Sequence, residues 1–168
     1  MEAGTNVLFT GFMGAGKTHV ALRCADNLGF DFYDMDPILE GRYGPIEKIF
    51  RKHGEGHFRI IERKLLREQL ALKGVVISAG GGTLVDVSSR EIAREKSIVI
   101  WLKVDYDVAA ERIKNDKKGI KRPNADAKML ERFTFRQPLY EKAAHITVDA
   151  NRPLDEVVAD ALRQLEQF

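Results

Sequence analysis

The chain has 168 residues, which is enough for one hydrophobic core and too short for two ordinary domains. Apolar residues make up 44% and charged residues 31%, a balance that excludes an intrinsically disordered chain. With 27 basic and 25 acidic side chains, the net charge of +2 creates no overall field that would select nucleic acid or a membrane as partner.

Short β-rich runs alternate along the chain with longer amphipathic segments. Strands are predicted at residues 6–10, 30–33, 74–78, 97–102 and 145–148. Their apolar residues are nearly continuous, which is typical of parallel strands that are covered on both faces. Helices are predicted at residues 17–28, 45–53, 56–72, 88–95, 106–115, 127–142 and 153–167. Asp105 is expected to cap the helix that follows it, and Pro153 to lie in a first turn.

This alternation predicts a single α/β domain over residues 1–168, with three layers and right-handed crossovers between parallel strands. Two segments interrupt the rhythm. A helical insertion, about residues 37–72, separates the second and third strands, and a basic stretch, about residues 115–126, precedes the penultimate helix. Ligands bind at the carboxyl ends of the strands in such sheets, so both segments are expected to reach over the site.

The strongest motif is GFMGAGKT at residues 11–18, which fits G-x-x-x-x-G-K-[ST] between a predicted strand and a predicted helix. Its glycines let consecutive amides point at phosphate oxygens, and the helix presents its positive end to the same anion. Lys17 is expected to bridge the β- and γ-phosphates of ATP, and Thr18 to place its hydroxyl on Mg²⁺. A chance glycine turn is the disfavoured alternative. The predicted nucleotide-binding residues are Gly14, Ala15, Gly16, Lys17, Thr18 and His19.

Two carboxylates, Asp34 and Asp36, follow the second predicted strand. In an extended segment both would point to the same side, with Met35 pointing away. One carboxylate beside Mg²⁺ and the other beside an acceptor hydroxyl would serve phosphoryl transfer. An equally weighted alternative is that Asp36, which precedes a proline, caps the next helix.

Three consecutive glycines, Gly80, Gly81 and Gly82, follow the third predicted strand. They remove every side chain where a ligand or another backbone must approach closely. Without the phosphate-binding motif a flexible turn would be the better interpretation. Together with that motif, the glycines are interpreted as a second backbone wall of the pocket.

Isolated arginines complete the predicted site. Arg59 precedes Glu62 by about one helical turn, so Glu62 is expected to orient it. Arg122 lies in the basic stretch and Arg136 on the penultimate helix. A single arginine is more often a solvated surface charge, but guanidinium groups are also preferred partners of carboxylates and phosphates.

Cys24 is the only cysteine, which excludes an intrachain disulfide and a cysteine-rich metal site. It lies in an apolar helical pattern and is expected to be a buried free thiol, and Trp101 is expected in the core. The N-terminus lacks the features of a signal peptide, and no apolar run approaches the ~20 residues of a membrane span. The cytoplasm is therefore the expected location, and a monomer is the default expectation.

In their order, these motifs resemble the shikimate kinase family, nearly from end to end. The resemblance rests on residues 11–18, Asp34 with Asp36, Phe58-Arg59 with Glu62, Gly80-Gly81-Gly82, Arg122-Pro123, Arg136 before Pro138-Leu139-Tyr140, and residues 148–152. It implies a P-loop kinase fold with sheet order 2-3-1-4-5, in which residues 37–72 form a substrate-binding insertion and residues 115–126 a lid. It also implies ATP-dependent phosphorylation of shikimate to shikimate 3-phosphate.

The resemblance further implies roles for single residues. Asp36 would bind the ring hydroxyls of shikimate and help to take the proton from the attacking one. Arg59 and Arg136 would clamp the carboxylate of shikimate, and Gly81 would add a backbone contact.

On the nucleotide side, the resemblance implies that Asp34 holds Mg²⁺ through water beside Thr18. Arg122 would reach the transferring phosphate from the lid, and Arg112 and Arg152 would flank the adenine. The chain departs from the family where Asn124-Ala125 replaces two leucines, so a more open or differently folded lid is expected.

Two other functions remain open at this level. One is another small-molecule kinase of the same fold, with a sugar acid or a nucleoside monophosphate as acceptor. The other is a nucleotide-binding module without turnover, although Lys17, Thr18 and both aspartates of the pair are present.

Overall fold

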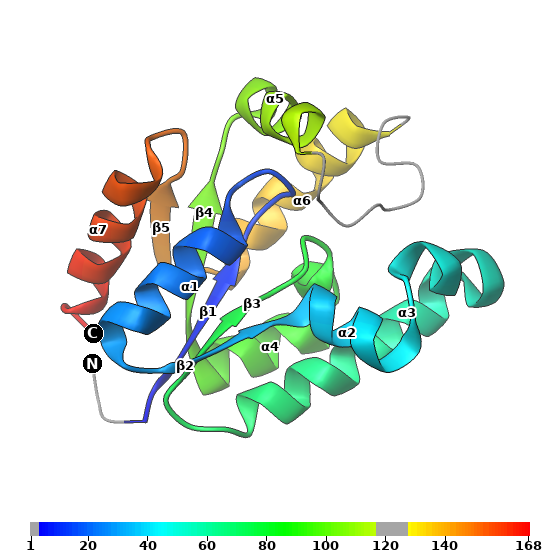
Figure 1. The fold of residues 1–168 in the computed structure, drawn as a ribbon, viewed down its shortest axis with the longest axis horizontal. Coiled ribbons are helices and arrows are strands. Elements are labelled where there is room, and N and C mark those ends of the chain that lie inside the picture. Colours follow the sequence, from blue (N-terminus) through cyan, green and yellow to red (C-terminus); the bar gives the residue numbers. More distant parts are fainter. Residues whose placement is uncertain (1–3, 117–127) are drawn as a thin grey trace.

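The computed structural model describes residues 4–116 and 128–168. Within them, five strands form one sheet between layers of helices (Figure 1). The strands are β1 Asn6–Thr10, β2 Asp31–Asp34, β3 Val75–Ser78, β4 Ser97–Lys103 and β5 Ile146–Asp149. Their order is β2-β3-β1-β4-β5 and every neighbouring pair is parallel, which confirms the expected sheet.

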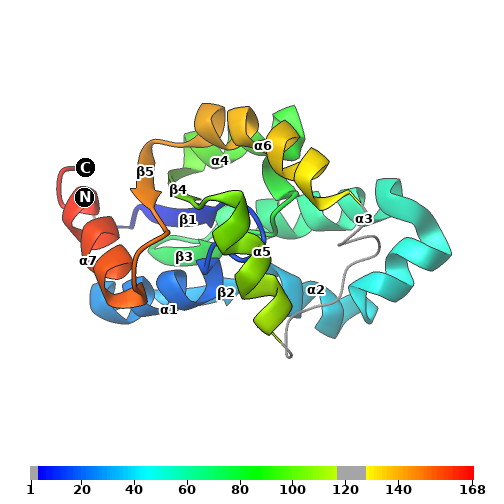
Figure 2. The same cartoon turned by 90° about the horizontal axis from the view of Figure 1, so that it is seen from above.

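Helices cover both faces of the sheet. They are α1 Lys17–Leu28, α2 Met35–Tyr43, α3 Ile46–Leu70, α4 Val87–Lys96, α5 Tyr106–Asn115, α6 Met129–Ala143 and α7 Leu154–Leu165, with the 3₁₀ turn η1 Thr83–Val85. Seen from above, α1 and α7 lie along one side of the sheet, and α4 and α6 along the other (Figure 2). The sheet is therefore covered as the near-continuous apolar strands predicted.

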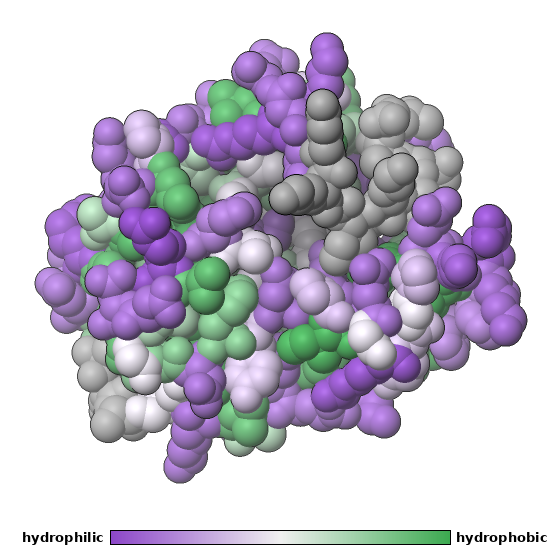
Figure 3. Space-filling model, in the orientation of Figure 1, coloured by the Kyte–Doolittle hydropathy of each residue, from purple (hydrophilic) through white to green (hydrophobic). Residues whose placement is uncertain are grey.

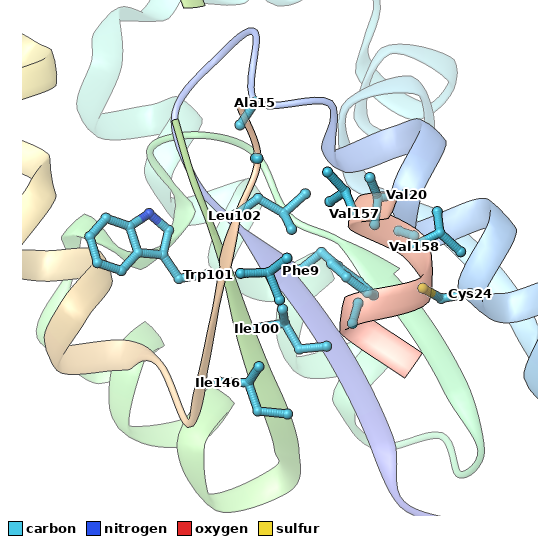
Figure 4. Packing of buried hydrophobic residues seen from close by; sticks show 14 of the residues in the cluster. Phe9, Ala15, Val20, Cys24, Ile100, Trp101, Leu102, Ile146, Val157 and Val158 are labelled. Atoms are coloured by element: carbon cyan, nitrogen blue, oxygen red, sulfur yellow. The ribbon is translucent and has the colours of Figure 1, made fainter. Parts of the chain in front are cut away.

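The core divides into two clusters, and on β1 this division follows the alternation of side chains between the two faces of the sheet. On β1, Val7 and Phe9 belong to the cluster that includes α1 and α7, and Leu8 to the cluster beneath α2 and α3. Figure 4 shows the first cluster, in which Trp101 points away from the α7 side. Trp101 packs near the ring of Tyr140 on α6, at 6.1 Å between ring centroids.

Cys24 lies on α1 inside the first cluster and is completely buried. Burial raises the pKa of its thiol to about 12, because the apolar surroundings disfavour the thiolate. The structure therefore agrees with the expectation of a buried, unreactive thiol.

The segment between β2 and β3 is helical and extends away from the sheet (Figure 1). The two helices predicted at 45–53 and 56–72 form the two halves of α3, which is kinked at Gly54, where φ is 81° and ψ is 171°. Gly54 makes this kink possible because a side chain strains a backbone with positive φ. The prediction missed α2 as a separate helix.

One expected cap is wrong, and an unexpected one is present. Asp105 occupies the position before α5, but its carboxylate accepts no capping hydrogen bond. Its backbone amide instead donates to Oδ1 of Asn151, at 2.9 Å, which joins the loops after β4 and β5. Asp86 does cap α4, because its carboxylate accepts from the Ser89 amide at 3.1 Å.

Hydrophilic side chains cover most of the face seen in Figure 3, with apolar residues interspersed among them. Among the helices of residues 4–116 and 128–168, none is long and apolar enough to cross a membrane.

Candidate active site

The phosphate-binding motif forms the turn between β1 and α1. Gly14 and Gly16 have positive φ angles of 79° and 85°, which a side chain would strain. The loop also packs closely on backbone: an ideal Cβ on Gly11 would lie 2.7 Å from the Leu102 carbonyl oxygen, and one on Gly14 only 2.6 Å from that of Ala109. The loop is thus held against β4 and α5 in a shape that only glycine permits at these positions.

Lys17 and Thr18, at the start of α1, are already engaged with neighbouring groups. The Lys17 ammonium donates to the carbonyls of Gly11 and Phe12, at 2.9 and 3.0 Å. The Thr18 hydroxyl donates to Oδ2 of Asp34 at 2.6 Å. The lysine therefore lies over the loop, and the threonine beside one of the two predicted carboxylates.

Burial raises the pKa of Asp34, the Thr18 hydrogen bond opposes this rise, and the charge of Asp36 adds to it. Burial makes the charged form of this carboxylate costly, so a nearby cation would stabilise it. The carboxylate and hydroxyl oxygens are hard ligands of the kind that Mg²⁺ prefers. In the described part of the chain no three His, Cys, Asp or Glu side chains lie close enough together to hold a metal ion. A cation beside Asp34 would therefore need further oxygen ligands from water or phosphate.

The predicted extended geometry of the aspartate pair is wrong. β2 ends at Asp34 and α2 begins at Met35, so Asp36 lies in the first turn of the helix rather than capping it. Met35 and Leu39, four residues apart, are both completely buried in the second core cluster, so the helix brings both side chains to the core. The two carboxylates still lie close enough for the charge of Asp36 to affect the pKa of Asp34.

The glycine loop, residues 80–82, is the meeting point of the predicted acceptor residues. An ideal Cβ on Gly80 would lie 3.0 Å from Oδ1 of Asp36. One on Gly81 would lie 3.6 Å from Nη1 of Arg136, and one on Gly82 only 2.4 Å from Nη2 of Arg59. Side chains from α2, α6 and α3 thus converge on backbone that has no side chain to exclude them.

Arg59 is held by two carboxylates on its own helix. Its Nη1 contacts Oε2 of the buried Glu62 at 2.6 Å, and its Nη2 contacts Oε1 of the exposed Glu55 at 3.0 Å. Burial opposes the charged guanidinium, but Glu62 and Glu55 outweigh it and raise the pKa of Arg59. Glu62 therefore orients Arg59, as its spacing predicted.

Of the other residues predicted to bind the nucleotide, Arg112 contacts the phosphate-binding loop. Arg112, on α5, donates to the Gly14 carbonyl at 3.2 Å. Arg152, after β5, contacts Asp160 on α7 at 2.6 Å and donates to the Asp149 carbonyl at 3.2 Å. His19 is exposed on α1. Arg122 and nearly all of the predicted lid lie outside the described residues.

The family model described as "Shikimate kinase" matches residues 13–166 of this chain. The chain belongs to the shikimate kinase family. A shikimate kinase from Thiobacillus denitrificans is 36% identical over 155 residues, which cover 90% of this chain and 85% of that protein. One from Dictyoglomus turgidum is 35% identical over 167 residues, 96% of this chain and 97% of that protein.

Solved shikimate kinases have the same fold. The Acinetobacter baumannii shikimate kinase in complex with shikimate has a TM-score of 0.86 at 32% identity, covering 97% of this chain and 93% of that one. The enzyme from Bacteroides thetaiotaomicron has a TM-score of 0.90 at 28% identity, covering 98% and 99%. A gluconokinase from Sinorhizobium meliloti, with a TM-score of 0.68 at 23% identity, shares the fold alone. Membership of a kinase family also implies that ATP is the phosphate donor.

Three residues that contact the predicted acceptor residues or their neighbours were not predicted to have a role. Glu55 contacts Arg59, and its spacing of four residues could have indicated the pair. The Thr83 hydroxyl donates to Oε1 of Glu62 at 2.8 Å, and the Tyr140 hydroxyl donates to the Gly81 carbonyl at 2.5 Å. These two hydrogen bonds join residues that are distant in the sequence, so no local pattern could have indicated them.

Proposed function

We propose that this chain transfers the γ-phosphate of ATP to shikimate and forms shikimate 3-phosphate. The observation that carries the proposal is the convergence of Asp36, Arg59 and Arg136 on the glycine loop. Two guanidinium groups complement the carboxylate of a small acid, and the aspartate complements a hydroxyl of the same molecule. Family membership supports shikimate as that acid.

For the nucleotide, we propose that the loop amides of residues 14–19 cradle the phosphates. Lys17 would exchange its two carbonyl partners for the β- and γ-phosphates, which offer it full negative charges. Arg112 and Arg152 would flank the adenine. The closeness of Arg112 to the Gly14 carbonyl and the contact between the loops after β4 and β5 support this assignment.

We propose Mg²⁺ as the cation, held by Thr18 and, through water, by Asp34. The oxygen ligands and the pKa of Asp34, which burial raises, fit a site that receives positive charge. When bound, the ion would neutralise charge on the phosphates of ATP.

For the chemical step, we propose that Asp36 orients the attacking hydroxyl and accepts its proton. Phosphoryl transfer depends mainly on positioning and on charge stabilisation, which Lys17 provides here. Arg122 would add a second cation from a lid at about residues 115–126, over a substrate-binding insertion at about residues 37–72. We place the reaction in the cytoplasm, where ATP is available, and in a monomer that has no need of nucleic acid or a membrane.

The proposal is tested by a coupled ADP-release assay with ATP, Mg²⁺ and a panel of acceptors. Shikimate is expected to support turnover, whereas gluconate and nucleoside monophosphates are not. Turnover with gluconate or a nucleoside monophosphate, but none with shikimate, would overturn the assignment of the acceptor.

Two variants separate the roles of the site residues. Lys17→Ala is expected to lower kcat about 100-fold with every acceptor, because its charge is needed as the phosphate moves. Arg136→Ala is expected to raise KM for shikimate roughly 30-fold, because the carboxylate of bound shikimate would lose the buried guanidinium that is proposed to pair with it. Arg23→Ala, at an exposed arginine of α1 whose partner Asp155 is also exposed, is the matched control and should change neither constant. An unchanged KM in Arg136→Ala would contradict the carboxylate clamp.

A further inference from the structure

The glycine loop is held from two sides by hydrogen bonds between buried groups. From α3, the Glu62 carboxylate accepts the Thr83 hydroxyl at 2.8 Å. From α6, the hydroxyl of the completely buried Tyr140 donates to the Gly81 carbonyl at 2.5 Å. Buried polar groups that lose such partners are costly, so each bond strongly favours one orientation of the loop.

One face of α6 contacts both halves of the site. Phe133, Arg136 and Tyr140 are spaced by three and four residues, which places them on the same face of the helix. The Phe133 ring packs edge-on against Phe12 of the phosphate-binding loop, at 5.1 Å between ring centroids. Arg136 and Tyr140 both reach Gly81. The face therefore spans the distance from the phosphate loop to the glycine loop.

The Gly81–Gly82 peptide needs an external restraint. Glycine adopts positive and negative φ about equally readily, so a peptide between two glycines can rotate without steric penalty. Among the described residues, the amides of Gly81 and Gly82 donate to no backbone carbonyl. The Thr83 amide closes the turn by donating to the Gly80 carbonyl at 3.0 Å, but type I and type II turns share this bond and differ in the orientation of the central peptide. Because the peptide is planar and trans, fixing the Gly81 carbonyl toward Tyr140 points the Gly82 amide in the opposite direction.

We propose that Tyr140 is a positioning residue for the acceptor site, an inference that rests on the proposed function for the identity of the acceptor. Its hydroxyl holds the Gly81–Gly82 peptide in one orientation. That orientation aims the Gly82 amide and sets the surface on which Arg59 packs, and Gly81 sets the place of Arg136 beside it. Tyr140 acts through the loop and does not itself contact the reacting atoms.

Tyr140→Phe tests this inference because it removes one oxygen atom and keeps the buried ring beside Trp101. KM and the calorimetric Kd for shikimate are expected to rise about tenfold, which corresponds to about 1.4 kcal/mol. The Kd for ADP is expected to stay within twofold, and kcat within threefold. Tyr33→Phe, on β2, is the matched control and is expected to match the wild type in all four constants.

The same titrations distinguish positioning from a purely structural role. If Tyr140→Phe only unfolded part of the protein, the calorimetric stoichiometry and the apparent kcat would fall together while Kd and KM stayed unchanged. That result would overturn the inference. An equal loss of affinity for ADP and for shikimate would also overturn it, because the defect would then not be confined to the acceptor side.

Amide hydrogen exchange tests the restraint without any acceptor. In Tyr140→Phe the amides of Thr83 and Val85, which donate to the Gly80 and Gly82 carbonyls at 3.0 and 3.1 Å, are expected to exchange at least tenfold faster than in the wild type, whereas Tyr33→Phe leaves them unchanged. Faster exchange with no shikimate turnover by the wild type would refute the proposed function but support the restraint. Unchanged exchange in Tyr140→Phe would refute the positioning role alone.

Discussion

Replacing Gly82 by alanine would displace Arg59 without disturbing the backbone. Gly82 has φ of −107° and ψ of −2°, a conformation open to alanine. Its added methyl group would lie 2.4 Å from Nη2 of Arg59, 2.6 Å from Nη1 and 2.8 Å from Cζ. Gly82→Ala therefore tests whether Arg59 must lie where the structure has it.

The size of the effect follows from these distances. Nonbonded heavy atoms settle at about 3.5 Å, so the guanidinium must move by roughly 1 Å. That movement strains its 2.6 Å contact with Glu62 and removes it from the acceptor position. A misplacement of about 1 Å can reduce a rate about 100-fold, equivalent to about 2.7 kcal/mol. Alanine restricts the unfolded chain, which offsets part of this strain, so the free energy of unfolding should change by less than about 1 kcal/mol.

The assay is steady-state ADP release with varied shikimate, supported by thermal unfolding. We expect kcat/KM for shikimate to fall between about 10- and 100-fold while the melting temperature changes little. Gly56→Ala is the matched control, because a methyl group there would meet no atom within 4 Å. Wild-type kcat/KM in Gly82→Ala, with the protein folded, would refute the requirement for Arg59 at its observed position.

Two further predictions concern stability. Asp86→Ala removes the cap of α4 and is expected to cost about 1 kcal/mol at pH 7 in urea unfolding. The hydrogen bond from Ser88, together with the Ser89 amide and the charge of Arg63, holds the pKa of Asp86 below its usual value. The contribution of Asp86 to the free energy of unfolding is therefore present at neutral pH and is lost as the pH falls through that lowered pKa. An equal difference from the wild type at pH 7 and at pH ~2 would contradict this. Gln69→Met is expected to stabilise the protein by about 1 kcal/mol, because both polar atoms of this buried side chain lack a partner among the described residues; a lower melting temperature would contradict it.

Local patterns in the chain were sufficient for the strands and for the phosphate-binding loop. Apolar runs placed the five strands within a residue or so of their observed bounds, because burial on both faces leaves a continuous apolar signal. The loop at 11–18 was readable because its function lies in eight consecutive residues whose backbone shape depends on their own glycines. The Arg59–Glu62 pair was readable for a similar reason, since helical spacing alone brings the two residues together.

Patterns failed where packing overrode local preference. The segment at Asp34–Asp36 was predicted to be extended, but a helix begins at Met35 and brings the side chains of Met35 and Leu39 into the core together. Asp105 stands in a capping position but its carboxylate makes no capping bond, and its backbone amide donates to Asn151 of another loop, a contact that no local pattern indicates.

The acceptor side of the site is formed only by the tertiary structure. Asp36, Arg59 and Arg136 come from three helices and meet only because the sheet order brings their elements around the glycine loop. Tyr140 reaches Gly81 across 59 positions of sequence, so no periodicity could have paired them. Motifs of adjacent residues can be predicted from the sequence because local backbone geometry forms them. The acceptor side is formed by packing between elements that are distant in the sequence, so it exists only once these elements have assembled.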